Sequence, residues 1–332
     1  MTNYLNREDL LVRKRVVMIL PLVLLLVLVV SQMSAFAAAK YPNRQINLII
    51  QAAPGGLSDL TARTVGSVAS EILGVPIVYT NKPGAAGAVA MSFVKSSKPD
   101  GYTIGYVPVE LAMVEALGYA QDVNPSSFDL ICASNIAAAT ITVRADSGWD
   151  TVEDLVEWCK VNPGKLRVGN SGTGSVWYVA GASWAKAAGI EVNHVPFDGA
   201  APAVAAILGK HIDMVPVSEM EVRSGVESGE LKILAVLSDQ RSQYNPDVPT
   251  LKELGYDISV SAWGGFAAPK GTPKEVLEAL YDAFGKGVNS ERFAEVTKAN
   301  GYSAFYLDHA DFTEFATGQY EFYKKVFVEL GH

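Results

Sequence analysis

Cysteine, histidine and net positive charge are all scarce in this chain of 332 residues. It has two cysteines and four histidines, and no histidine stands at metal-ligand spacing from a cysteine or carboxylate, so we expect no metal site. Lys and Arg number 27 against 35 Asp and Glu, a net charge of −8. An acidic chain without a basic stripe argues against nucleic acid as a partner. The net charge does not attract anions from a distance, so any anion-binding site must depend on donors at the site itself.

The two cysteines, Cys132 and Cys159, fall on different predicted elements. An exported protein could oxidise such a pair. Two buried thiols are an equally good interpretation. The sequence leaves both alternatives open.

Beyond the N-terminus, the sequence has no long uncharged apolar run. At the N-terminus, the basic cluster at 13–15 precedes the apolar stretch 16–30, and Ala35-Phe36-Ala37 has the small-x-small form of a signal-peptidase site. We interpret residues 1–37 as a secretory signal, cut near Ala37 or Ala39. The alternative is an uncleaved membrane anchor, because the uncharged stretch from Val16 to Ala39 could span a bilayer. Either way we expect an exported, periplasmic or extracytoplasmic protein.

What the remaining sequence does contain is an alternation of strand and helix patterns. Residues 46–50, 76–79 and 102–107 are predicted strands, and the segments 58–73 and 85–95 between them are predicted helices. A βαβαβ order predicts an α/β fold with a parallel sheet flanked by helices.

A second series of the same kind follows a less regular middle. Residues 140–143 and 166–169 are predicted strands, and Thr151 is the expected N-cap of a helix that lies between them. Further strands and helices follow, and the segment 310–330 shows helical spacing of apolar residues. We therefore expect two mostly parallel sheets.

Two glycine-rich turns, one in each series, carry the chemical signal. The first spans residues 52–59 and the second residues 170–175, each between a predicted strand and a predicted helix. Free N–H groups and the positive dipole end at a helix N-terminus favour an anion. Glycine lets the backbone approach a ligand closely. The turns thus favour a small carboxylate held by neutral donors.

Nucleotide binding and catalysis find less support. Neither turn contains Lys or Arg, and neither completes the phosphate-loop or dinucleotide pattern, so we expect no cofactor. Ser171 fails the nucleophile-elbow pattern because Thr173 stands where the last glycine belongs. His194 is a lone histidine, and no complete nucleophile, base and orienter set is visible. We expect a binding protein and not an enzyme.

The order and spacing of several short motifs resemble one known family over nearly the whole chain after the N-terminal segment. This sequence resembles the substrate-binding receptors of tripartite tricarboxylate transporters, the Bug-type extracytoplasmic solute receptors. The motifs that carry the resemblance are Tyr41–Ile46, Pro54–Asp59, Asn81–Gly87, Lys98–Thr103, Asn162–Leu166, Ser171–Ser175, His194–Phe197, Pro249-Thr250 and Ala268–Pro273.

The resemblance implies a two-lobed, Venus-flytrap fold of the periplasmic-binding-protein type, with a cleft between its lobes. Lobe 1 would comprise residues 40–139 plus 263–332, and lobe 2 residues 140–262. Segments 108–110, 197–199 and 217–219 are expected to form walls of the site. The implied ligand-binding residues are Gly55, Gly56, Ser58, Asp59, Ser171, Gly172, Thr173, Gly174, Ser175, Tyr178, Phe197 and Gly199. Asp59 is expected to brace its helix start, since it would repel an anion.

This chain departs from the family pattern at four places. Ala52 and Ala53 replace an aromatic residue, Tyr178 replaces a histidine, Phe197-Asp198 replaces an aromatic-basic pair, and Gly264 stands at an often basic position. The lost basic contacts make a mono- or dicarboxylate, or a solute with one carboxylate, at least as good an expectation as a citrate-like tricarboxylate.

The function implied is capture of a small organic carboxylate by lobe closure and its delivery to a membrane permease. The expected partners are therefore that ligand and the permease subunits. A sensory module that reports to a membrane signalling protein is the first alternative, and an α/β enzyme is the second.

Overall fold

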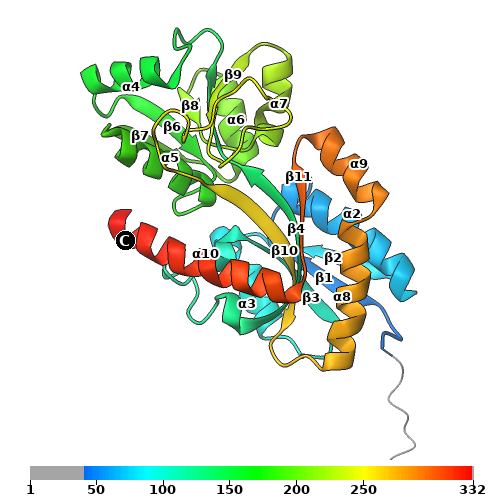
Figure 1. Cartoon of the computed structure of the whole chain (residues 1–332). Helices are drawn as coiled ribbons and strands as arrows, with labels where there is room; N and C mark the ends of the chain where they lie inside the picture. Colours follow the sequence, from blue (N-terminus) through cyan, green and yellow to red (C-terminus); the bar gives the residue numbers. More distant parts are fainter. Residues whose placement is uncertain (1–40, 331–332) are drawn as a thin grey trace, which may run out of the picture. The chain divides into compact units, whose positions relative to one another are not determined.

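The structure is a computed structural model that describes residues 41–330. The predicted signal segment lies outside the described residues. From Arg44 onward the chain forms two β-sheets with helices on both faces of each (Figure 1). Among the described helices, none is both long enough and apolar enough to cross a membrane.

The first sheet has six strands in the order β11-β4-β10-β3-β1-β2. Its β1, β2 and β3 pair in parallel, as the βαβαβ pattern predicts, while β10 and β11 pair antiparallel with their neighbours. The strands are β1 (Ile46–Ile50), β2 (Ile77–Asn81), β3 (Thr103–Pro108), β4 (Phe128–Ala138), β10 (Ser261–Pro269) and β11 (Ser303–Leu307).

Helices α2 and α8 lie on one side of this sheet, and α3 and α10 on the other (Figure 1). They bury a core that includes Leu48, Ile104 and Phe266. The bounds are α2 (Leu57–Leu73), η1 (Ala85–Gly87), α3 (Ala88–Lys95), η2 (Val109–Ala112), η3 (Pro125–Ser127), α8 (Lys274–Val288), α9 (Glu291–Asn300) and α10 (His309–Leu330).

The second sheet has five strands in the order β7-β6-β8-β5-β9. Helices α4 and α5 lie on one side and α6 and α7 on the other (Figure 1). The elements are β5 (Thr140–Arg144), α4 (Val152–Val161), β6 (Leu166–Asn170), α5 (Val176–Ala188), β7 (Val192–Pro196), α6 (Ala200–Leu208), β8 (Met214–Val215), α7 (Glu219–Glu227) and β9 (Leu231–Val236).

The two-sheet α/β architecture is confirmed, but the sheets are mixed and not mostly parallel. In the first sheet β10 runs antiparallel to both β3 and β4, and in the second β5 runs antiparallel to both β8 and β9. These strands adjoin the two places where the chain passes between the sheets, after β4 and before β10. A strand that enters a sheet without a βαβ crossover is free to pair antiparallel.

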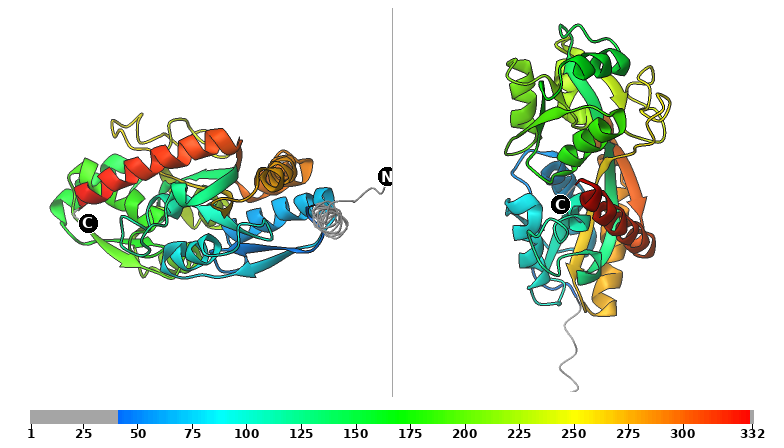
Figure 2. Two further views of the ribbon diagram at one scale, coloured as in Figure 1. Left: turned by 90° about the horizontal axis from the view of Figure 1, so that it is seen from below. Right: turned by 90° about the vertical axis from the view of Figure 1, so that its left-hand side faces the viewer.

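Helix α10 also connects the two halves of the chain. It packs on β4 and η2 and extends toward α5 of the second half (Figures 1 and 2). There Lys186 Nζ lies 3.2 Å from a carboxylate oxygen of Glu329. Both side chains are more than half exposed, so this ion pair adds little stability.

Both cysteines are free and buried, Cys132 in β4 and Cys159 in α4. Burial raises the pKa of both thiols, that of Cys159 to about 11. The structure therefore favours two buried thiols over a disulfide.

Candidate functional site

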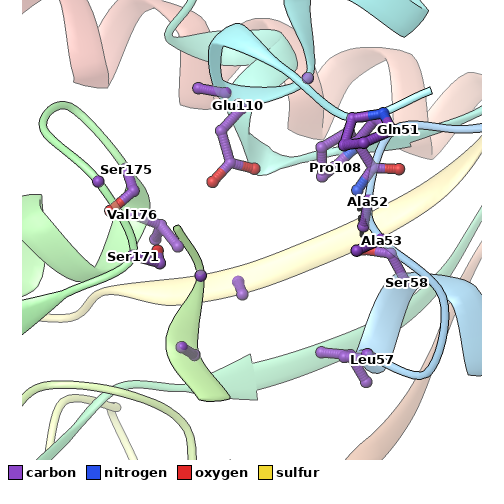
Figure 3. A pocket seen from close by; sticks show the side chains of 18 of the residues that line it. Gln51, Ala52, Ala53, Leu57, Ser58, Pro108, Glu110, Ser171, Ser175 and Val176 are labelled. Carbon is purple, nitrogen blue, oxygen red and sulfur yellow. Dashed lines mark hydrogen bonds between the residues drawn. The ribbon is translucent and has the colours of Figure 1, made fainter. Parts of the chain in front are cut away.

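A cavity of about 1030 Å³ opens between the two sheets and is lined by segments from both (Figure 3). Its size is at the upper end for a small-molecule site. The predicted residues that line it are Gly55, Gly56, Ser58, Ser171, Gly172, Thr173, Ser175, Phe197 and Gly199. Both glycine-rich turns thus reach one space, although more than a hundred residues of chain separate them.

The first turn joins β1 to α2, and Gly56 is the helix N-cap. No side chain caps this helix start. The N–H groups of Gly56, Leu57 and Ser58 have no hydrogen-bond partner among the described residues. They are the unsatisfied donors of a helix N-terminus, and they adjoin the cavity. The first turn can therefore bind an anion.

Asp59 does not line the cavity. It is 5% exposed and accepts hydrogen bonds from Gly55 N, Arg63 Nε and Asn81 Nδ2, at 2.9, 2.8 and 2.9 Å. Burial alone would raise the pKa of Asp59, but these donors outweigh it and hold the pKa below its ordinary value. Asp59 holds the first turn in shape, which is the bracing role expected for it.

Substituting Asp59→Asn should lower the free energy of unfolding at pH 7 by about 1–3 kcal/mol. A depressed pKa stabilises the fold above the unfolded-state pKa of about 4, and this contribution is lost as pH falls through the folded-state value. Urea unfolding at pH 7 and pH 3 measures it. The difference between variant and parent should shrink at pH 3. Equal losses at both pH values would contradict this assignment.

The second turn joins β6 to α5. Its Gly172 N–H donates to Asn170 Oδ1 at 3.1 Å, and the Ser175 hydroxyl caps α5 by accepting from Tyr178 N at 3.2 Å. Gly172 has φ +115°, a conformation that favours glycine. The turn is therefore fixed by its own short polar side chains.

Two predicted residues near this turn do not line the cavity. Gly174 faces Leu117, whose side chain would lie 2.8 Å from an added Cβ. Tyr178 packs on His194 with ring centroids 4.8 Å apart. Both serve packing, so we do not carry them into the proposed site.

A third glycine-rich turn lines the cavity and was missed by the sequence prediction. Pro83–Gly87 joins β2 to α3, and its residues Gly84, Ala85, Ala86 and Gly87 all have positive φ. Such a conformation is costly for alanine and is often found at functional sites. The signal was present in the sequence as two glycines and a proline between a strand and a helix.

The lining carries acids and no bases. Its charged residues are Glu110, Asp198 and Glu221, and no Lys, Arg or His of the described chain lines it. Burial raises the pKa of Glu110 to about 7, while the Val176 backbone at the start of α5 acts to lower it. Burial also raises the pKa of Glu221, which accepts from Ser218 N and Oγ at 2.9 and 2.8 Å.

The absence of a side chain at Gly264 has a packing reason. A Cβ there would lie 1.8 Å from Tyr106 Oη. Tyr106 is 2% exposed, and its hydroxyl donates to Asn135 Oδ1 at 2.7 Å. The Tyr106 phenol thus fills the space in which a basic side chain would begin.

Two sheets with helices on both faces, and between them a cavity edged by helix N-termini, define the class of two-lobed solute-binding receptors. The sequence profile described as tripartite tricarboxylate transporter family receptor matches residues 61–331, and the chain belongs to this family.

Relatives of known sequence or structure support this family assignment. A UPF0065 protein encoded in the gbd 5′ region of Cupriavidus necator is 32% identical over 89% of this chain and 90% of its own. The solved structure of a TctC solute-binding protein from Polaromonas is 36% identical, covers 87% of this chain and 99% of its own, and has a TM-score of 0.73. The solved structure of the periplasmic binding protein BugD is 29% identical in sequence. It covers 88% of this chain and 99% of its own, and its TM-score is 0.79.

Proposed function

We propose that this receptor captures a small organic carboxylate outside the cytoplasm and presents it to the permease subunits of a tripartite transporter. The observation that supports this best is that two glycine-rich turns from different sheets line one cavity. The unpaired N–H groups of Gly56, Leu57 and Ser58 supply donors for the carboxylate. The transporter role is supported by the chain's membership of the tripartite tricarboxylate transporter receptor family.

Ligand capture would proceed by closure of two lobes, residues 40–139 plus 263–332 and residues 140–262. The crossings between them meet at Ala139, whose N–H donates to Val260 O at 2.9 Å and whose carbonyl accepts from Leu237 N at 2.8 Å. On the cavity rim, Tyr119 Oη donates to Thr173 O at 3.1 Å. Closure would remove water, and each neutral N–H donor then contributes more.

We propose binding without turnover. His194, the histidine nearest in sequence to Ser171, packs on Tyr178 and does not line the cavity. The hydroxyl of Ser171 thus lacks this base. Incubation of the pure protein with each ligand, followed by chromatography, should return the ligand unchanged.

Thermal unfolding in the presence of a panel of organic acids tests the proposal. A ligand that binds only the folded state stabilises it by about 2.7 kcal/mol at a concentration of 100 times Kd, which should raise Tm by several degrees. At least one mono- or dicarboxylate should do so, and the corresponding amide or alcohol should not. A cooperative transition that no organic acid shifts would count against the proposal.

A further inference from the structure

Glu110 places a carboxylate inside the cavity. It follows β3 in the short helix η2, and its side chain projects into the space between the Ser171–Val176 side and the Gln51–Ser58 side (Figure 3). Burial raises the pKa of Glu110, and the Val176 backbone at the start of α5 acts in the opposite direction. Glu110 therefore presents a carboxyl group to the cavity in which the ligand would bind.

Gln51 provides a second, independent acceptor. It lines the same cavity and is 9% exposed. Its Nε2 donates to Ser58 Oγ at 2.8 Å, but its Oε1 is buried without a hydrogen-bond partner. A buried acceptor without a donor is costly, but this oxygen lies beneath the cavity surface, so a ligand would reach it only if the Gln51 side chain turned.

The charged side chains that line the cavity also favour a ligand that carries a positively charged group. Glu221 is committed to the start of α7, because both its hydrogen bonds to Ser218 close a capping box. Asp198 is exposed. Glu110 is thus the carboxylate that faces the interior, and no basic side chain of the described lining compensates it. Free donors lie at the first turn, and Glu110 supplies a carboxyl group elsewhere in the same cavity.

We propose that the ligand is an amino carboxylate, whose carboxylate binds the free amides of Gly56, Leu57 and Ser58 and whose protonated amine binds Glu110. This inference rests on the proposed function, since it concerns the same cavity. A dicarboxylate would place its second negative charge beside Glu110, and like charges in an enclosed site disfavour binding strongly.

The pH dependence should differ between the two ligand classes. Glu110 has a pKa raised to about 7, and Glu221, Tyr106 and Tyr323 face it from other elements. Burial raises the pKa of both tyrosines, so they stay neutral near pH 7. Glu110 therefore gains its charge between pH 6 and 8. Binding of an amino carboxylate should strengthen over that range, and binding of a dicarboxylate should weaken.

Calorimetry with chain-length-matched probes tests the proposal. The probes are butyrate, succinate and 4-aminobutyrate, then hexanoate, adipate and 6-aminohexanoate, and the common α-amino acids. At pH 7.5 at least one amino carboxylate should bind tenfold or more tighter than the dicarboxylate and monocarboxylate of its length. Glu110→Gln should reduce this preference at least tenfold. The control Glu314→Gln, at an exposed carboxylate of α10 that does not line the cavity, should change it less than threefold.

The outcomes separate the two proposals. Binding of a dicarboxylate or plain monocarboxylate as tightly as any amino carboxylate, or a preference unchanged in Glu110→Gln, would overturn the amino-carboxylate inference and leave carboxylate capture standing. Failure of every amino carboxylate to bind would do the same. Failure of every carboxylate in the wider panel of organic acids would overturn both.

Discussion

Substitution of Gly56→Asp is expected to weaken carboxylate binding more than 100-fold without lowering Tm. Gly56 has φ −82° and ψ 177°, an extended conformation open to any residue, and a Cβ there would meet nothing within 4 Å. Aspartate is a favoured N-cap, and its carboxylate would take the N–H groups that the ligand needs. The variant should therefore fold normally and carry its own anion in the site.

Gly56→Ala is the matched control. It adds the same Cβ into the same open space but brings no acceptor and no charge. We expect its affinity to fall by less than about fivefold, a cost below about 1 kcal/mol. Calorimetry with the tightest carboxylate, together with circular dichroism melting, measures both variants. A folded Gly56→Asp that binds like the parent would remove the first turn from the site.

The second large effect is expected on stability, at Gly264. This residue pairs with Pro108 of β3 and Asn135 of β4 in the centre of the first sheet. Because an added Cβ would overlap the Tyr106 hydroxyl, Gly264→Ala must displace that ring and break its 2.7 Å hydrogen bond to Asn135. Overpacking together with a lost buried hydrogen bond should cost about 2–4 kcal/mol in the free energy of unfolding.

Gly318→Ala provides a control of opposite sign. Gly318 is exposed within α10, and a Cβ there meets nothing within 4 Å. Alanine in a helix interior should stabilise the protein by about 0.5–1 kcal/mol. Urea unfolding of both variants compares the two sites. Equal stability of Gly264→Ala and the parent would mean that Tyr106 does not occupy the position described.

The features that the sequence predicted correctly are those with local causes. The helix N-cap at Thr151 is confirmed, since its Oγ1 accepts from Asp154 N at 3.1 Å and Asp154 in turn accepts from Thr151 N at 2.9 Å. The C-terminal helix expected over residues 310–330 is α10, His309–Leu330. Capping and helical periodicity depend on residues within a few positions, so a sequence carries them in full.

The long strands β4 and β10 were missed because their sequences carry no strand pattern. Phe128–Ala138 is mostly apolar and Ser261–Pro269 is rich in alanine and glycine, and both lie in the middle of a covered sheet. A strand covered on both faces shows no alternation of apolar and polar residues. For the same reason the antiparallel pairing around β10 was not foreseen.

The composition of the cavity was predicted only in part. The two glycine-rich turns could be predicted from the sequence, because helix N-termini with small residues have a recognisable local pattern. Glu110 belongs to the segment 108–110, which the family resemblance placed in a wall of the site, whereas Gln51 and the Pro83–Gly87 turn were not predicted as site residues. Each follows a strand of the first sheet at the same sheet edge, and only the order of the strands brings them to the cavity.

The sequence by itself determined the α/β class, the two glycine-rich turns and the family, since these depend on short motifs and on their order along the chain. The tertiary structure showed that both turns line one cavity, as the family resemblance implied. It alone decided that Tyr106 fills the place of a basic side chain at Gly264, and that Glu110 faces the interior with no basic side chain in the described lining. The physical reason is that charge balance within a cavity depends on side chains distant in sequence, and folding alone determines which of them meet.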